Sequence, residues 1–200
     1  LTMGANFGDI DNDGFLDVYL GTGAPAVEAI GPNIMYNNLG GEYFNDVTFA
    51  GRFGHLQKGH GVAFGDLDSD GDQDVFIQLG GFYVIDKFTN ALYENPGTEN
   101  HWLGVKLIGT ASNITGVGAM IKVSTKTQNG KDEVFYKHIN SGGSFGSSSL
   151  EQIIGLGQAK EITRLEIRWP IKRPNQVFTK VPLDKFLLIV EDKDEFQLRD

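Results

Sequence analysis

The chain has 200 residues, a formal net charge of −9, 40% hydrophobic residues and no cysteine. The absence of cysteine excludes a disulfide scaffold and a thiolate metal site, and no apolar run approaches the ~20 residues of a membrane span. The charge is uneven, because residues 1–100 carry 15 acidic and 3 basic side chains whereas residues 101–200 carry 11 and 14. This asymmetry predicts two units with different roles and argues against nucleic acid as a partner of the first.

An internal repeat organises the first half of the chain. Residues 7–14 (Phe-Gly-Asp-Ile-Asp-Asn-Asp-Gly) recur as residues 64–71 (Phe-Gly-Asp-Leu-Asp-Ser-Asp-Gly), at an offset of 57 residues. The register holds without a gap over more than 30 positions, so the sequence predicts two copies of one structural unit. Further residues return at the same offset, among them Asp17, Val18, Asn33, Tyr36, Asn38 and Gly40 as Asp74, Val75, Asn90, Tyr93, Asn95 and Gly97.

Short strands are expected throughout the chain, since no stretch of the first hundred residues has sustained helical periodicity. Segments rich in β-branched and aromatic residues flank both acidic motifs, and glycines separate them. The expected strands of the two copies are residues 5–10, 18–20 and 33–37, then 61–67, 75–77 and 90–94. The second half does not repeat, and its expected strands are residues 102–108, 119–125, 134–139, 165–169 and 186–190.

The aspartates of the two acidic loops carry the predicted chemistry. Alternate carboxylates converge on one point when the backbone curls around it, and Gly14 and Gly71 stand where such a curl needs a positive φ. An all-oxygen, highly charged site suits Ca²⁺, whereas Mg²⁺ takes fewer protein ligands and Zn²⁺ prefers histidine or cysteine. The predicted ligands of the two calcium sites are the side chains of Asp9, Asp11, Asp13 and Asp17, those of Asp66, Asp68, Asp70 and Asp74, and the carbonyls of Phe15 and Asp72.

Repulsion between the carboxylates makes a cation necessary. Two carboxylates about 4 Å apart repel by about 4 kcal/mol at an effective dielectric constant near 20. We therefore expect calcium to close each loop and to add its binding energy to the folding energy. An EF-hand is the alternative, but it requires glutamate at position twelve and flanking helices, and Leu20 and Ile77 stand at that position.

Both halves resemble known families. The motif Phe-Gly-Asp-x-Asp-x-Asp-Gly-x-x-Asp, followed by Asn-x-x-Tyr-x-Asn-x-Gly, resembles the FG-GAP or VCBS repeat over about residues 1–97. That resemblance implies β-propeller blades with calcium in the acidic loop. A propeller usually has about four to eight blades, so we expect this chain to be part of a longer one. The second half resembles the ASPIC/UnbV domain at residues 100–103, 118–119, 142–147, 154–157 and 167–170.

Together the two halves are similar to the C-terminal end of proteins of the cartilage acidic protein type, a mostly extracellular family. The resemblance implies an all-β fold in which residues 1–97 form a partial β-propeller of two blades. A small β-sandwich or barrel-like domain is expected at residues 98–191, and a charged, solvent-exposed tail at residues 192–200.

We expect a non-enzymatic, calcium-stabilised module in the extracellular space, at the cell surface or in the periplasm. Its expected partners are proteins, matrix components or subunits of an assembly, as in cell adhesion, with neither nucleic acid nor membrane insertion. Residues 142–146 match the G-x-S-x-G pattern, but no histidine follows Ser144, so a glycine- and serine-rich turn is expected there. Two alternatives remain: a lectin-like module in which a tryptophan (Trp102 or Trp169) or a calcium ion contacts a sugar, and an accessory segment of a larger secreted enzyme.

Overall fold

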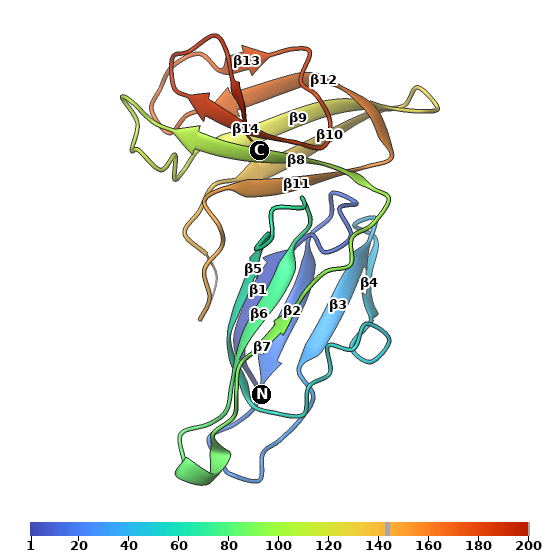
Figure 1. The fold of residues 1–200 in the computed structure, drawn as a ribbon, viewed down its shortest axis with the longest axis vertical. Helices are drawn as coiled ribbons and strands as arrows, with labels where there is room; N and C mark the ends of the chain where they lie inside the picture. The colour runs from blue at the N-terminus through green and yellow to red at the C-terminus, as the bar shows by residue number, and fades with distance from the viewer. Residues whose placement is uncertain (143–144, 200) are drawn as a thin grey trace.

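The protein consists of two β-rich units joined end to end (Figure 1). The computed structural model describes residues 1–142 and 145–199. Within these ranges the chain forms strands β1–β15 and one short 3₁₀ helix, η1 (Val84–Asp86). In Figure 1 the first unit, which contains β1–β7, lies below the second, which contains β8–β15. The predicted all-β class is confirmed.

Each copy of the repeat forms a small antiparallel sheet. The first sheet has the order β1-β2-β3-β4 and the second the order β5-β6-β7. The strands are β1 (Thr2–Gly8), β2 (Asp17–Thr22), β3 (Ile34–Leu39), β4 (Tyr43–Asp46), β5 (Gly59–Gly65), β6 (Asp74–Leu79) and β7 (Ala91–Tyr93). Each acidic loop joins the first two strands of its sheet, so the repeat in the sequence is a repeat of blade-like sheets.

The two sheets share one hydrophobic core. Tyr19 and Met35 enter it from the first sheet, and Val62, Val75 and Ile77 enter it from the second. Burial alternates along β2, as the period-two geometry of a strand requires. Because this core belongs to both sheets, they form a pair of adjacent blades, and the predicted partial propeller is confirmed.

The second unit is a sandwich of two four-stranded sheets with the orders β10-β9-β12-β13 and β11-β8-β14-β15. Inward-facing residues of both sheets, including Leu103, Ile121, Leu165 and Leu187, form a single core, as the face-to-face packing of two sheets requires. All strand pairs of the unit are antiparallel except β8 with β14. The strands are β8 (His101–Ile108), β9 (Met120–Thr127), β10 (Asp132–His138), β11 (Gln152–Gly157), β12 (Ala159–Arg168), β13 (Gln176–Phe178), β14 (Lys185–Val190) and β15 (Gln197–Arg199).

The end of the chain is ordered, although most of it is exposed. Residues 197–199 form β15, which pairs with β14 through the register Phe186 with Arg199. The Arg199 guanidinium also forms an ion pair with Glu151. The free edge of β14 offers backbone groups for this pairing, while the side chains of Gln197 and Leu198 stay exposed, as expected for the tail. Asp200 lies outside the described residues.

Trp169 is buried, whereas Trp102 is half-buried. Trp169 is 4% exposed, and its Nε1–H donates to Gln176 Oε1 at 2.8 Å. Trp102 packs against Phe186, with 4.8 Å between the ring centroids. A ring buried in the sandwich offers no face to a sugar, so the prediction of glycan stacking on Trp169 is wrong.

Glu191 anchors the loop that follows β8. Its Oε2 accepts hydrogen bonds from the backbone N–H groups of Thr110, Ala111 and Ser112 at 2.8, 2.9 and 2.8 Å. Burial raises the pKa of this carboxyl, but these bonds and the Ser112 hydroxyl outweigh burial and lower the pKa to about 2. A charged carboxylate satisfied by three successive N–H groups therefore fixes the loop against β14.

The two units are in close contact at one glycine of each acidic loop. A Cβ built on Gly71 lies 1.8 Å from Trp102 Cε2, and one built on Gly14 lies 2.2 Å from Phe135 Cε1. The Gly157 N–H donates to the Asn12 carbonyl at 2.9 Å. The acidic loops of the repeats are thus part of the seam between the units.

Gly71→Ala is expected to destabilise the protein by about 2–5 kcal/mol, because a left-handed φ costs roughly 1–2 kcal/mol and overpacking about 1–3 kcal/mol. The matched control is Gly40→Ala, since Gly40 also has a positive φ but nothing within 4 Å of its Cβ position. Urea unfolding of both variants measures the difference. Equal losses of stability would show that the seam does not restrict residue 71.

Candidate metal sites

The two acidic loops follow the same backbone path. The first connects β1 to β2 and the second connects β5 to β6. Gly14 and Gly71 have φ of 92° and 96°, as predicted for the curl, and Asn12 and Ser69 have φ of 56° and 66°. Both loops are flanked by strands, and within residues 1–142 and 145–199 the single helical segment is η1, so the exclusion of an EF-hand is confirmed.

The first aspartate of each loop organises the turn through the same hydrogen bonds. Asp9 Oδ1 accepts from the N–H of Asp13 at 3.1 Å, and its Oδ2 accepts from the N–H of Gly14 at 3.0 Å. In the second loop, Asp66 accepts the corresponding bonds from Asp70 at 3.2 Å and from Gly71 at 3.0 Å. The local sequence therefore closes both turns in the same way.

The last aspartate of each loop ties the turn to the next strand. Asp17 accepts from the N–H groups of Ile10 at 2.7 Å and Asn38 at 2.7 Å. Asp74 repeats these bonds, with Leu67 at 3.0 Å and Asn95 at 2.9 Å as donors. The side-chain amides of Asn38 and Asn95 also donate to the carbonyls of Leu16 and Gln73 at 3.1 and 3.2 Å, so asparagine has the same role in both copies.

Six of the eight predicted aspartate side chains gather into two clusters. Carboxylate oxygens of Asp9, Asp11 and Asp17 lie within 4.8 Å of one another, and so do those of Asp66, Asp68 and Asp70. Asp13 and Asp74 are not among these two clusters. Asp13 Oδ1 accepts from the Phe15 N–H at 2.8 Å, and both oxygens of Asp74 accept backbone N–H groups. Coordination by any of these side chains, or by the carbonyls of Phe15 and Asp72, stays a prediction.

Burial and, after it, the crowding of like charges raise the pKa values of Asp9 and Asp17 in the first loop. Burial, followed by the charges of Asp13, Asp17 and Asp11, raises the pKa of Asp9 to about 7. Burial also raises the pKa of Asp17 to about 6, against the hydrogen bonds from Asn38 and Ile10 that lower it. A cation among these oxygens relieves the repulsion that the shifts express.

Asp72 is a residue that sequence reasoning assigned only a carbonyl role. Its side chain is buried, and burial together with the charges of Asp70 and Asp74 raises its pKa to about 7. Within the described ranges its Oδ1 has no hydrogen-bond partner. A buried carboxylate oxygen without a donor suits a hard cation, so the donor set of this loop fits calcium. The sequence repeat did not indicate this side-chain role, because the first copy has Phe15, which lacks a carboxylate, at the position that matches Asp72.

Asn37 is a second residue that the sequence did not single out. Its Nδ2 donates to Asp11 Oδ2 at 3.0 Å and to Asp17 Oδ1 at 2.9 Å. The residue 57 positions later is Glu94, which is exposed. The Asn37 amide therefore lies beside the carboxylates of the first loop, whereas the matching residue of the second copy is an acid.

The comparisons with known proteins agree with this geometry. A family model described as an FG-GAP-like repeat matches residues 9–77, which include both acidic loops. A model described as ASPIC and UnbV matches residues 109–196. The chain joins FG-GAP-like repeats to an ASPIC/UnbV domain. No curated protein matches the chain.

Together, the FG-GAP-like repeats and the ASPIC/UnbV domain suggest a protein-interaction module of the extracellular type. FG-GAP repeats typically occur in extracellular or secreted proteins. The described residues contain no helix that is long and apolar enough to cross a membrane. Of the G-x-S-x-G pattern in the ASPIC/UnbV domain, Gly143 and Ser144 lie outside the described residues.

Proposed function

We propose that this FG-GAP and ASPIC/UnbV protein is a non-enzymatic, calcium-stabilised module whose acidic loops hold the two units together. The observation that carries the proposal is the position of the first loop at the seam. The Asp11 carbonyl accepts hydrogen bonds from Thr98 Oγ1 at 2.9 Å and Asn100 Nδ2 at 2.8 Å. Any change in the shape of this loop therefore moves the contacts of the second unit.

The residues that would hold calcium are the aspartates of the two clusters, together with the buried Asp72 in the second loop. All these donors are oxygens, which favours a hard cation with flexible geometry. When bound, calcium supplies the positive charge that lets the clustered carboxylates stay ionised. The backbone N–H groups that bond Asp9 and Asp66 hold both loops in position to receive the ion.

The partner surface that we propose is the apolar loop at the far end of the first unit (Figure 1). Phe82, Val84 and Ile85 are 92%, 82% and 82% exposed. The loop is held by a hydrogen bond from the Gly81 N–H to the Asp86 carbonyl at 2.7 Å. Consecutive exposed apolar side chains on a fixed loop are typical of a contact surface for proteins, matrix components or assembly subunits.

Isothermal titration tests the metal proposal. Calcium is expected to bind at two sites with a dissociation constant on the order of 10⁻⁴ M, as in other extracellular modules. Asp68→Asn is expected to leave one site. Asp194→Asn, which makes the same change of charge on an exposed residue outside the loops, should leave both. Absence of binding, or an unchanged stoichiometry in Asp68→Asn, contradicts the proposal.

A further inference from the structure

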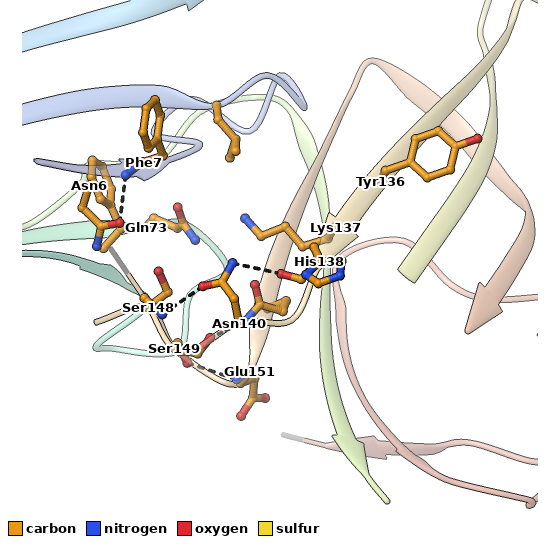
Figure 2. A pocket seen from close by; sticks show the side chains of 14 residues that line it. Asn6, Phe7, Gln73, Tyr136, Lys137, His138, Asn140, Ser148, Ser149 and Glu151 are labelled. Carbon is orange, nitrogen blue, oxygen red and sulfur yellow. Dashed lines mark hydrogen bonds between the residues drawn. The ribbon is translucent and has the colours of Figure 1, made fainter. Parts of the chain in front are cut away.

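A cavity of about 350 Å³ opens at the seam between the two units (Figure 2). Residues of both units line it, and none of the ten predicted calcium ligands is among them. Its volume lies at the lower end of the range of about 300–1,000 Å³ that small-molecule sites occupy, and boundaries between domains are frequent places for such sites.

Lys137 lines this cavity and supplies an ammonium group to it. It projects from β10 toward Gln73 on the opposite wall (Figure 2). Across residues 1–142 and 145–199, Lys137 forms no ion pair. Burial lowers the pKa of this ammonium group, and the charge of Asp9 opposes the shift. The ammonium group is thus partly desolvated and has donors to offer to a ligand.

Gln73 presents a second donor in a fixed orientation. Its side chain is 7% exposed, and its Oε1 accepts the Asp9 N–H at 2.9 Å. That bond assigns the amide, because only the oxygen can accept it. In the described chain, Nε2 donates to no other group, so it remains available to the cavity. A Cβ on Gly8 would lie 2.7 Å from Gln73 Oε1, so close packing also holds the amide in place.

The remaining walls offer acceptors and apolar surface. Gln152 is buried at the cavity, its Nε2 donates to the Ser149 carbonyl, and no described residue donates to its Oε1. Phe7 and Leu16 contribute exposed apolar side chains. Glu151 lies at the same cavity, but its charge is neutralised by the ion pair with Arg199. The lining therefore combines donors for an anion, acceptors for hydroxyl groups and a surface for C–H groups.

We infer that this cavity binds an acidic sugar of the hexuronate class, with its carboxylate on Lys137 and Gln73. A carboxylate accepts from both donors, which charge-assisted hydrogen bonding favours. A simple carboxylic acid leaves the Gln152 oxygen and the apolar wall unused, whereas a neutral sugar leaves the ammonium group unpaired. The ring hydroxyls and C–H face of a hexuronate complement all three kinds of group. The inference uses no calcium ligand and so goes beyond the proposed function.

NMR titration of the ¹⁵N-labelled chain with glucuronate, glucose and acetate tests the inference at one fixed calcium concentration. Glucuronate is expected to shift the amide signals of cavity residues. Glucose and acetate should each bind at least roughly tenfold more weakly, because each lacks one set of bonds. Equal binding of glucose and glucuronate, equal binding of acetate and glucuronate, or no binding of glucuronate overturns the inference.

Two variants locate the site. Lys137→Met and Gln73→Glu should each weaken glucuronate binding at least roughly tenfold. Gln73→Glu keeps the acceptor for the Asp9 N–H while it replaces the donor with a like charge. Lys106→Met, on the exposed face of β8 and outside the cavity, should bind as the parent does. Unchanged binding in the first two variants overturns the inference. Calcium stoichiometry of Lys137→Met, measured separately, tests the proposed function alone.

Discussion

Removal of calcium is expected to lower the melting temperature of the protein by about 10–20 °C. A ligand at about 100 times its dissociation constant stabilises the folded state by about 2.7 kcal/mol per site. For a chain of this size, about 1 kcal/mol corresponds to roughly 2–4 °C. Two sites filled at about 10 mM calcium therefore account for the shift, if each dissociation constant is on the order of 10⁻⁴ M. Calorimetry with calcium and with excess chelator measures it.

The controls for this prediction separate a specific site from general screening of charge. Magnesium at the same concentration is expected to stabilise less, since it binds reluctantly to sites made wholly of protein oxygens. Asp68→Asn should retain about half of the calcium effect, because one loop is intact. A melting temperature that excess chelator leaves unchanged would contradict the proposed stabilising role of the metal.

Asp86→Ala is expected to destabilise the protein by about 3–5 kcal/mol, the usual cost of leaving a buried charge without its partner. The side chains of Lys58 and Asp86 are 2% and 4% exposed, and Lys58 Nζ lies 2.5 Å from Asp86 Oδ2. The ammonium group also donates to the Ala26 carbonyl at 2.6 Å. In Asp86→Ala the ammonium group keeps that single bond in a site closed to water, and the apolar loop keeps its backbone bond from the Gly81 N–H.

Urea unfolding of Asp86→Ala is compared with that of Glu133→Ala. Glu133 pairs with Lys131 at 2.9 Å, but the lysine side chain is 73% exposed. Loss of this exposed ion pair in Glu133→Ala should therefore lower the stability by about 1 kcal/mol or less. The double variant Lys58→Met with Asp86→Leu should recover most of the lost stability, because apolar groups of similar size replace the charges. Similar losses in the two single variants would show that burial of the pair contributes nothing.

The hydrophobic pattern of the sequence was sufficient to predict the strands in which that pattern is clear. Residues 75–77 and 102–108 lie within β6 and β8. The pattern missed β4, β11, β13 and β15. Of these, β13 and β15 have three residues each and find their place by pairing with β12 and β14. β11 contains two glycines, and its residues 152–156 are all buried, so no alternation marked it.

The candidate metal sites were largely predictable, because the spacing of aspartates around Gly14 and Gly71 is a local property of the chain. Six of the eight side chains cluster as expected. The roles of Asp72 and Asn37 were not predictable, since burial of one and the contacts of the other depend on the surrounding fold.

The sequence by itself determined the all-β class, the two repeated turns and the oxygen-rich character of their ligands, since short-range φ preferences and residue spacing decide these features. Only the tertiary structure decided that the turns lie at the seam, that Lys58 and Asp86 pair in the interior, and that Lys137 faces Gln73 across a cavity. Such contacts join residues far apart along the chain. They depend on how two hydrophobic cores pack, which no local pattern encodes.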